Sequence, residues 1–358
     1  MNNVSFIIAI DSSYEMTTNF FETFINNSFV KSSEIIIVND CINNIKTLNY
    51  LNQIKCANNN IKLIDLDIKV GYGRANNIGV EKSTKDYLFF INTDVFVEKN
   101  CFELMYEYLE QNTADCVQPL LLWPQNNRIQ CAGSFFGPYF KNHLFAGRRI
   151  ESIDLAKIPK SRQALTSALY AMKKDTFVKH GGFDEFYYNK LESFELSFKL
   201  SLAGKKCICA TEALAYHSQG AGRNQYYFDF RQQEVYFWTH MGNKIIPDIC
   251  KYYELQISEK MRQSSYTLIA IAQTREVKKI VDSLGITICA YIEINGIDPR
   301  RINLYDLLPY SVHNSISPII FFVENITNLS GNLNWFEQRK QEDVVMDTYG
   351  NLLYAKKI

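Results

Sequence analysis

The sequence predicts an α/β protein in which a doubly wound, mostly parallel sheet is followed by a second, smaller α/β domain. Two observations support this prediction. In roughly the first hundred residues, short β-branched runs alternate with longer helical patterns, an order typical of parallel sheets with right-handed crossovers. A new β-α-β rhythm begins at Tyr266, after a polar stretch from Ile257 to Ser265. We therefore expect one domain over residues 1–260 and a second over residues 261–358.

The elements of the first domain are predicted from hydrophobic periodicity and from helix-ending residues. Short apolar, β-branched runs predict strands at Val4–Ile10, Glu34–Val38, Ile61–Leu66, Asp86–Ile91 and Leu165–Met172. Helical patterns are expected around Asn19–Asn27, from Asn43, within Arg74–Lys82, at Glu103–Gln111, near Asp175, at Glu192–Ala203 and at Tyr226–Met241. Gly204 ends the helix from Glu192. Between Pro119 and Pro138 the pattern loosens, which predicts mixed strands and substrate loops there.

The second domain is predicted from the same kind of alternation. We expect strands at Thr267–Ala272, Ile288–Ile294 and Ile319–Val323, with a helix at Arg275–Leu284. No glycine follows the first of these strands, so the close backbone approach that a dinucleotide pyrophosphate needs is missing. The pattern favours an interaction or dimerisation module over cofactor binding.

Composition excludes several classes of protein. The 358 residues are 47% hydrophobic and carry 38 basic and 38 acidic side chains, so no global basic field would attract nucleic acid. No apolar run approaches the roughly 20 residues of a membrane-spanning helix, and the polar Met1-Asn-Asn start does not resemble a signal peptide. Nine cysteines without paired C-x-x-C spacing argue against disulfides and structural zinc. These observations predict a cytoplasmic protein, with contact to the inner face of the membrane left open.

Acidic and amide side chains follow three of the predicted strands. Asp11 and Asp40 follow the first and second strands and could accept hydrogen bonds from a ribose or a base, or could each cap the next helix. Asn92-Thr93-Asp94 follows the strand from Asp86. Because Mg²⁺ and related cations often use one or two carboxylates together with substrate phosphates, Asp94 is a metal candidate. The alternative is an Asx turn at the start of the next helix.

A glycine-rich segment lies between the third strand and its helix. Gly71 and Gly73 allow close backbone approach to a ligand, the helix N-terminus favours negative charge, and Arg74 can pair with phosphate. A tight turn alone would also explain the two glycines. The segment lacks the spacing of a P-loop.

A third group of polar residues surrounds the helix from Glu192. Asp184 and Glu185 precede this helix, Glu192 and Glu195 occupy its first turn, and His217 follows a later strand. A carboxylate here could accept a proton from a hydroxyl that attacks a sugar. The alternatives are first-turn acids that favour the helix dipole and a structural histidine.

Taken together, these motifs resemble the family 2 glycosyltransferases with the GT-A fold, especially the bacterial rhamnosyltransferase-like branch. The resemblance covers about residues 1–245 and rests on motifs in the family's order. They are Glu34-Ile-Ile-Ile-Val-Asn-Asp40, Gly71-Tyr-Gly-Arg-Ala-Asn-Asn-Ile-Gly79, Phe90-Ile-Asn-Thr-Asp94, Gly182-Phe-Asp-Glu185 and Ala213-Leu-Ala-Tyr-His217. The segment from residue 261 more vaguely resembles the small Rossmann-like modules found beside sugar-modifying enzymes.

The resemblance implies inverting transfer from a nucleoside-diphosphate sugar, a UDP- or dTDP-sugar, to a hydroxyl of a glycan, lipid-linked glycan or protein. It implies that Mg²⁺ or Mn²⁺ bridges the diphosphate and Asp94, that His217 binds the metal or diphosphate, and that Asp40 contacts the base or ribose. Arg74 and Asn76 should lie in the nucleotide region. We expect Asp11, Gly71 and Asn92 to line the same donor site; Asn92 replaces the first acid of a full DXD triplet.

One departure from the family pattern concerns the catalytic base. The family usually has Glu-Asp, then any residue, then Asp-Leu, whereas this chain has Glu192-Ser193-Phe194-Glu195-Leu196. Because Ser193 is not basic at neutral pH, Glu192 is the first candidate for the base and Glu195 the second.

Two rival functions come from other classes. A sugar-nucleotide-binding pseudoenzyme that scaffolds a partner, or forms a homo-oligomer, through the C-terminal domain is favoured by Ser193. A nucleotidyltransferase is disfavoured, because Asp11-Ser-Ser-Tyr follows the first strand where a glycine-rich basic loop would be expected.

Overall fold

The computed structural model describes residues 2–136, 141–218, 230–246 and 248, together with short segments between 267 and 355. The chain divides into two units. The first consists of Met1–Phe135, His143–Ile150 and Pro159–Ile245, and the second of Phe136–Asn142, Glu151–Ile158 and Ile246–Ile358. The domain boundary expected near residue 260 and the helix expected at Arg275–Leu284 lie outside the described residues.

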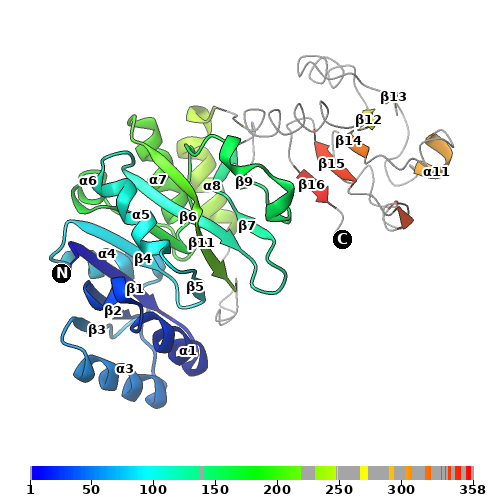
Figure 1. Ribbon diagram of the computed structural model, residues 1–358. Helices are drawn as coiled ribbons and strands as arrows, with labels where there is room; N and C mark the ends of the chain where they lie inside the picture. Colours follow the sequence, from blue (N-terminus) through cyan, green and yellow to red (C-terminus); the bar gives the residue numbers. More distant parts are fainter. Residues whose placement is uncertain are drawn as a thin grey trace. The chain divides into compact units, whose positions relative to one another are not determined.

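A mixed sheet forms the centre of the first unit (Figure 1). Within the described residues its strands run in the order β3-β2-β1-β4-β10-β6-β11-β5, and β7 pairs with β6. Their bounds are β1 Val4–Ile10, β2 Glu34–Asn39, β3 Ile61–Asp65, β4 Tyr87–Ile91, β5 Val95–Val97, β6 Cys116–Leu122, β7 Ile129–Cys131, β10 Leu169–Lys173 and β11 Cys207–His217. A separate pair joins β8, Ser134–Phe136, to β9, Lys141–His143.

The strand directions decide which residues share an edge. Strand β1 runs parallel to both β2 and β4, and β2 runs parallel to β3. Strand β10 is antiparallel to β4 and β6, whereas β11 is parallel to β6. The loops after β1 to β4 therefore lie at one edge of the sheet, the edge at which ligands bind in open α/β folds.

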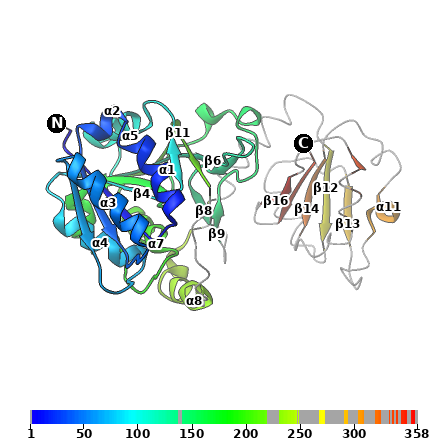
Figure 2. The same ribbon diagram turned by 90° about the horizontal axis from the view of Figure 1, so that it is seen from below.

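The helices cover both faces of this sheet. The bounds are α1 Tyr14–Phe24, α2 Ser28–Lys31, α3 Ile45–Ala57, α4 Tyr72–Lys82, α5 Cys101–Glu110, α6 Lys174–Lys179, α7 Glu192–Leu202 and α8 Phe230–Met241. Short 3-10 turns occur at Ile150–Ser152, Leu155–Lys157 and Gly242–Lys244. In Figure 2, α2 and α5 lie on one side of β4, and α4 and α7 lie on the other.

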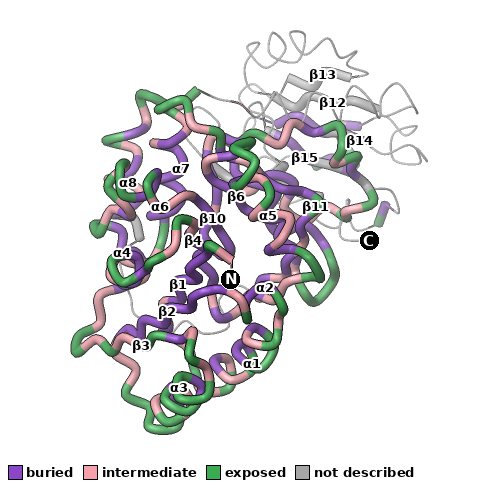
Figure 3. The backbone as a smooth tube through the Cα atoms, turned by 60° about the vertical axis from the view of Figure 1, so that its left-hand side comes forward, coloured by how far each residue is buried: buried purple, intermediate pink, exposed green. Residues whose placement is uncertain are grey.

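The core has two layers because side chains alternate between the faces of each strand. Phe6 and Ile8 of β1 pack with apolar residues of α1, α2, α3 and α5. Ile7, between them, packs on the other face with residues of α4, α6 and α7. The central strands are buried along their length (Figure 3), as expected for a sheet that is covered on both faces.

The structure corrects two details of the predicted elements. The expected helix around Asn19–Asn27 begins earlier, at Tyr14, because Ser13 caps it by accepting a hydrogen bond from the Met16 backbone N–H. Asn27 then caps a separate helix, α2. Pro119, expected in a loose region, lies within strand β6 next to a bulge in the pairing with β11, a place where a residue without an N–H is tolerated.

The second unit contains a sheet of its own among its described residues. The strand order is β13-β12-β14-β15-β16, with bounds Ala290–Glu293, Thr267–Ala272, Ile319–Val323, Val344–Asp347 and Leu352–Ala355 in that order. A helical turn, α11, spans Leu304–Leu307. Strands β12 to β15 are parallel and β16 is antiparallel to β15. A Rossmann-like assignment for this unit stays a prediction.

None of the helices in the part of the chain that the structure describes is long and apolar enough to cross a membrane.

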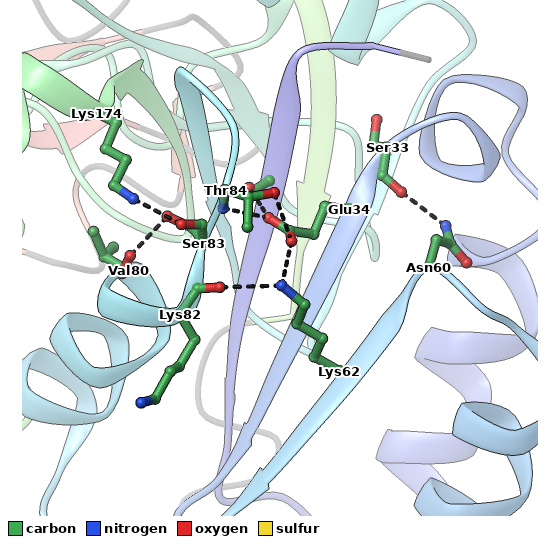
Figure 4. Close-up of polar contacts among 10 residues, drawn as sticks. Ser33, Glu34, Asn60, Lys62, Val80, Lys82, Ser83, Thr84 and Lys174 are labelled. Atoms are coloured by element: carbon green, nitrogen blue, oxygen red, sulfur yellow. Dashed lines mark hydrogen bonds and ion pairs between the residues drawn. The ribbon is translucent and has the colours of Figure 1, made fainter.

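A buried carboxylate joins three strands at the opposite edge of the first sheet (Figure 4). Glu34 accepts hydrogen bonds from Lys62 Nζ at 2.7 Å and from the Thr84 backbone N–H at 2.8 Å, and it also bonds to the Ser5 hydroxyl. Burial raises the pKa of this carboxyl, but the combined hydrogen bonds outweigh burial and leave the pKa below its ordinary value. Glu34 therefore stabilises the fold in its charged form.

We expect Glu34→Gln to lower the free energy of unfolding at pH 7 by about 1–3 kcal/mol, because charge-assisted hydrogen bonds are lost. The pKa of Glu34 is depressed in the folded protein. Its contribution to the free energy of unfolding is therefore complete above the unfolded pKa of about 4.3 and is lost as pH falls through the folded pKa. Urea unfolding at pH 7 and pH 4 measures the difference in free energy of unfolding between the unmodified chain and Glu34→Gln. Glu81→Gln, at an exposed position of α4, is the control, and equal effects of the two variants would contradict the role of Glu34.

Candidate functional site

The predicted strand-end residues share one edge of the sheet. Asp11, Asp40 and Asn92 directly follow β1, β2 and β4, which are parallel neighbours. The loops after β1 and β4 touch, because the Thr93 hydroxyl lies 3.0 Å from the Ser12 hydroxyl. The Asn92 backbone N–H donates to the Ala168 carbonyl at 3.0 Å, just before β10.

Asp94 and His217 meet at this edge. Strand β5, which follows Asp94, pairs with the end of β11, so that Val95 is opposite His217. The Ser218 backbone N–H donates to the Asp94 carbonyl at 3.0 Å. As a result, Asp94 Oδ1 lies 3.3 Å from His217 Nε2, and the two side chains are only 13% and 11% exposed. Residues more than 120 positions apart in the sequence thus form one pair.

This pair suits a divalent cation. Neighbouring ligands of an octahedral ion, each about 2.1 Å from the metal, lie about 3 Å apart, close to the 3.3 Å between Asp94 Oδ1 and His217 Nε2. Among the described residues, no group of three or more His, Cys, Asp or Glu side chains could hold a metal. An Asp–His pair could hold a cation that takes its remaining ligands from a substrate and from water, the usual arrangement for Mg²⁺ beside phosphates.

Asp40 organises the loop before α4. Its two carboxylate oxygens accept hydrogen bonds from the backbone N–H groups of Val70 and Gly71, at 2.7 and 2.9 Å. Burial raises the pKa of Asp40, and these two hydrogen bonds oppose the rise. Asp11 lies nearby in an ion pair with Lys69, with 2.5 Å between carboxylate oxygen and ammonium nitrogen. Contacts of Asp11 and Asp40 with a nucleotide remain predictions.

The backbone at Gly71 lies very close to Tyr188 of the same chain. Gly71 has φ of +85°, and a Cβ there would lie 2.3 Å from the Tyr188 carbonyl oxygen. The same carbonyl accepts a hydrogen bond from the Tyr72 backbone N–H at 2.8 Å. Glycine is required at this position by the contact with Tyr188, whatever role the loop has toward a ligand.

Helix α4 is joined to the Gly182-Phe-Asp-Glu185 segment. Asn77 donates to the Phe183 carbonyl at 2.9 Å and accepts from the Phe183 backbone N–H at 3.0 Å. Arg74, which is 54% exposed, pairs with Glu185 at 3.6 Å. Asn76 is buried and donates to the Tyr72 carbonyl at 2.8 Å. Two motifs of the sequence are therefore in contact, while nucleotide roles for Arg74 and Asn76 stay predictions.

The two candidate bases have different surroundings. Glu192 begins α7 and is buried. Burial, together with the negative charges of Glu192 and Asp94, raises the pKa of the Tyr72 hydroxyl, so both carboxylates act on one phenol. Glu195 is also buried and pairs with Lys199 at 3.1 Å. Burial raises the pKa of Glu195, and Lys199 opposes that rise.

Two residues near these side chains, Tyr72 and Gln130, were not predicted as site residues from the sequence. The negative charges of Glu192 and Asp94 both raise the pKa of Tyr72, whose hydroxyl donates to the Ser167 carbonyl at 3.1 Å. Gln130 contacts the imidazole of His217. Tyr72 stands inside the quoted glycine-rich motif and could have been chosen from it, whereas nothing in the local pattern around Gln130 distinguishes it.

Comparison with known proteins shows what the first part of the chain is similar to. Residues 5–151 match the family model for glycosyl transferase family 2. The O-antigen biosynthesis protein RfbC of Myxococcus xanthus is 23% identical over 163 residues, which are 44% of this chain and 13% of RfbC. The chain spans less than a quarter of the length of the curated relatives that it matches. The rhamnosyltransferase-like branch stays a prediction.

Solved glycosyltransferase structures share the fold. GalNAc-T7, solved with UDP, GalNAc and Mn²⁺, is 16% identical, with a TM-score of 0.52 over 80% of this chain and 55% of that one. A segment of S. aureus TarS, in complex with UDP-GlcNAc, is 14% identical, with a TM-score of 0.50 over 72% of this chain and 71% of that one. The predicted α/β fold of GT-A type is therefore confirmed.

Proposed function

We propose that this chain is an inverting glycosyltransferase that moves a hexosyl or rhamnosyl group from a UDP- or dTDP-sugar to a hydroxyl of a glycan, lipid-linked glycan or protein. The contact between Asp94 and His217 at the carboxyl edge of the sheet is the observation that carries this proposal. The family 2 match over residues 5–151 and the O-antigen relative support a role in surface glycan synthesis.

The residues of the site divide into two proposed roles. On the donor side, Asp94 and His217 would hold Mg²⁺ or Mn²⁺ against the diphosphate, and Asp11, Asp40 and Arg74 would bind the nucleotide. The remaining donor-site residues would be Gly71, Asn76 and Asn92. When bound, the cation supplies Lewis-acid stabilisation of the departing diphosphate.

On the acceptor side, Glu192 is the proposed base. It would take the proton from the acceptor hydroxyl as that oxygen attacks the sugar. Glu192 lies against the first turn of α4, where a Cβ on Gly73 would be 3.6 Å from Glu192 Cβ, and the charges of Glu192 and Asp94 both raise the pKa of Tyr72 in the same turn. Glu195 forms an ion pair with Lys199 on its own helix, and Lys199 favours the charged form of this carboxylate.

The proposal predicts metal-dependent stabilisation by one class of nucleotide. In a thermal-shift panel of UDP-, dTDP- and GDP-sugars, we expect one class to raise the melting temperature only with Mn²⁺. At a ligand concentration of 100 times Kd the gain is about 2.7 kcal/mol. Mn²⁺ alone and each nucleotide alone are the controls. If no sugar nucleotide has an effect with or without Mn²⁺, the proposed donor site is wrong.

A second candidate, a sugar-nucleotide-binding pseudoenzyme, is favoured by one observation. Ser193 stands where the family usually has its acidic base, and it is buried at the start of α7. This candidate predicts metal-dependent nucleotide binding without release of the nucleoside diphosphate from the donor. A coupled assay for nucleoside-diphosphate release, run with the donor that the thermal-shift panel selects, separates the two functions.

A further inference from the structure

Gln130 lies at an irregular position of the sheet. Strand β7 pairs with β6 through Cys131 opposite Leu121 and Ile129 opposite Leu122. Two steps along β7 therefore match one step along β6, and Gln130 is the extra residue of a β-bulge. Bulges redirect a side chain and often occur beside active sites. The side chain of Gln130 is buried and reaches the end of β11.

This side chain makes two contacts with one residue. Gln130 Nε2 donates to the His217 carbonyl oxygen at 2.9 Å, and Gln130 Oε1 lies 2.6 Å from His217 Nδ1. A backbone carbonyl can only accept, so the first contact fixes the amide nitrogen of Gln130 beside it. The amide oxygen must then face the ring, and because this oxygen also only accepts, Nδ1 is the donor.

The hydrogen bond at Nδ1 also determines the state of the other ring nitrogen of His217, Nε2. A neutral imidazole with its proton on Nδ1 has its lone pair on Nε2, and Nε2 is the atom that lies 3.3 Å from Asp94 Oδ1. The opposite tautomer would carry its N–H on Nε2 and could not offer a lone pair to a cation there. A half-turn of the ring would break the hydrogen bond at Nδ1. Gln130 thus holds the tautomer and the ring orientation that leave Nε2 ready to bind a cation.

We propose that Gln130 is a positioning residue for the metal site, acting through His217. This inference rests on the proposed function, because it presupposes that Asp94 and His217 bind the cation. A partner on the second nitrogen of a metal-binding histidine commonly orients the ring, and its loss typically lowers metal affinity on the order of 10- to 100-fold. The alternative is a purely structural link between β7 and β11.

The test measures Mn²⁺ binding directly. Mn²⁺ alone is titrated into the full chain, free Mn²⁺ is followed by its electron paramagnetic resonance signal, and the ¹⁴N modulation of the bound ion reports imidazole coordination. We expect Gln130→Met, which keeps the volume but removes both contacts, to weaken binding on the order of 10- to 100-fold and to lose the ¹⁴N modulation. Gln130→Glu keeps an acceptor for Nδ1 and should bind Mn²⁺ within about threefold of the unmodified chain while retaining the modulation.

A matched control separates positioning from packing. Gln118 is also buried and makes three hydrogen bonds through its amide, to the Pro119 carbonyl, to Cys131 Sγ and from the Thr166 backbone N–H. Gln118→Met should lower the melting temperature without changing Mn²⁺ affinity. If Gln130→Met binds Mn²⁺ like the unmodified chain, with the modulation intact, the role of Gln130 is wrong while the metal site stands. If the unmodified chain shows no ¹⁴N modulation, the His217 metal site fails, and the inference fails with it.

Discussion

Replacing Asp94 with alanine is expected to reduce sugar transfer on the order of 10³-fold or more and to abolish Mn²⁺-dependent nucleotide binding. The carboxylate is one of the two proposed side-chain ligands at this edge, and its Oδ1 lies 3.3 Å from His217 Nε2. A Lewis acid at a departing diphosphate contributes several kcal/mol, and each 1.36 kcal/mol corresponds to a tenfold change in rate. Nucleoside-diphosphate release and calorimetric titration with nucleotide and Mn²⁺ measure the two effects.

Asp67 offers a matched control for Asp94. It is an exposed aspartate in the loop after β3, at the same edge of the sheet. Asp67→Ala removes the same charge from the same edge without touching the proposed cation site, so turnover and metal dependence should change little. Asp94→Asn keeps the shape of the side chain and should be nearly as inactive as Asp94→Ala, because the negative charge is what binds the cation. An Asp94→Ala variant that still binds nucleotide in a Mn²⁺-dependent way would refute the site.

Glu192→Gln is expected to lower kcat on the order of 10²- to 10⁴-fold, the usual contribution of a positioned general base. The substitution keeps the size of a buried side chain and removes only its ability to accept a proton. The affinity for nucleotide and Mn²⁺ should therefore stay within a few-fold of the unmodified chain. Single-turnover assays and calorimetric titration distinguish this loss of chemistry from a loss of binding.

Glu195→Gln tests the second candidate for the base. Because Glu195 forms an ion pair with Lys199 on the same helix, we expect this variant to lower the melting temperature and to affect kcat much less than Glu192→Gln. The reverse order of effects would transfer the catalytic role to Glu195. Undiminished turnover in both variants would remove both residues from the mechanism.

Much of the proposed donor site could be predicted from the sequence, because its residues follow the ends of strands. Asp11, Asp40 and Asp94 each follow an apolar run, and parallel strands bring their carboxyl ends to one edge without any further information. The pairing of Asp94 with His217 was only partly predictable. It needs β5 to pair with β11, and β5 is a three-residue strand that no local pattern indicated.

Other features could not be predicted, because they arise from packing between distant segments. The glycine at position 71 appeared suited to a ligand, yet its close neighbour is the Tyr188 carbonyl. Arg74 appeared suited to phosphate, yet it contacts Glu185 in this structure. The start of α1 was misjudged because the cap at Ser13 is a local hydrogen bond that the hydrophobic pattern does not reveal.

Local periodicity and the direction of parallel strands were enough to predict the α/β fold, the strand ends at the proposed donor edge, and the acidic start of α7. Which side chains meet depends instead on contacts between distant segments, which no local pattern reveals. Gln130, His217 and Asp94 come from three separate strands or strand ends, and a one-residue bulge in β7 accompanies the contact between the first two. Such contacts depend on register, and a single step of register in a strand moves a side chain to the other face of the sheet.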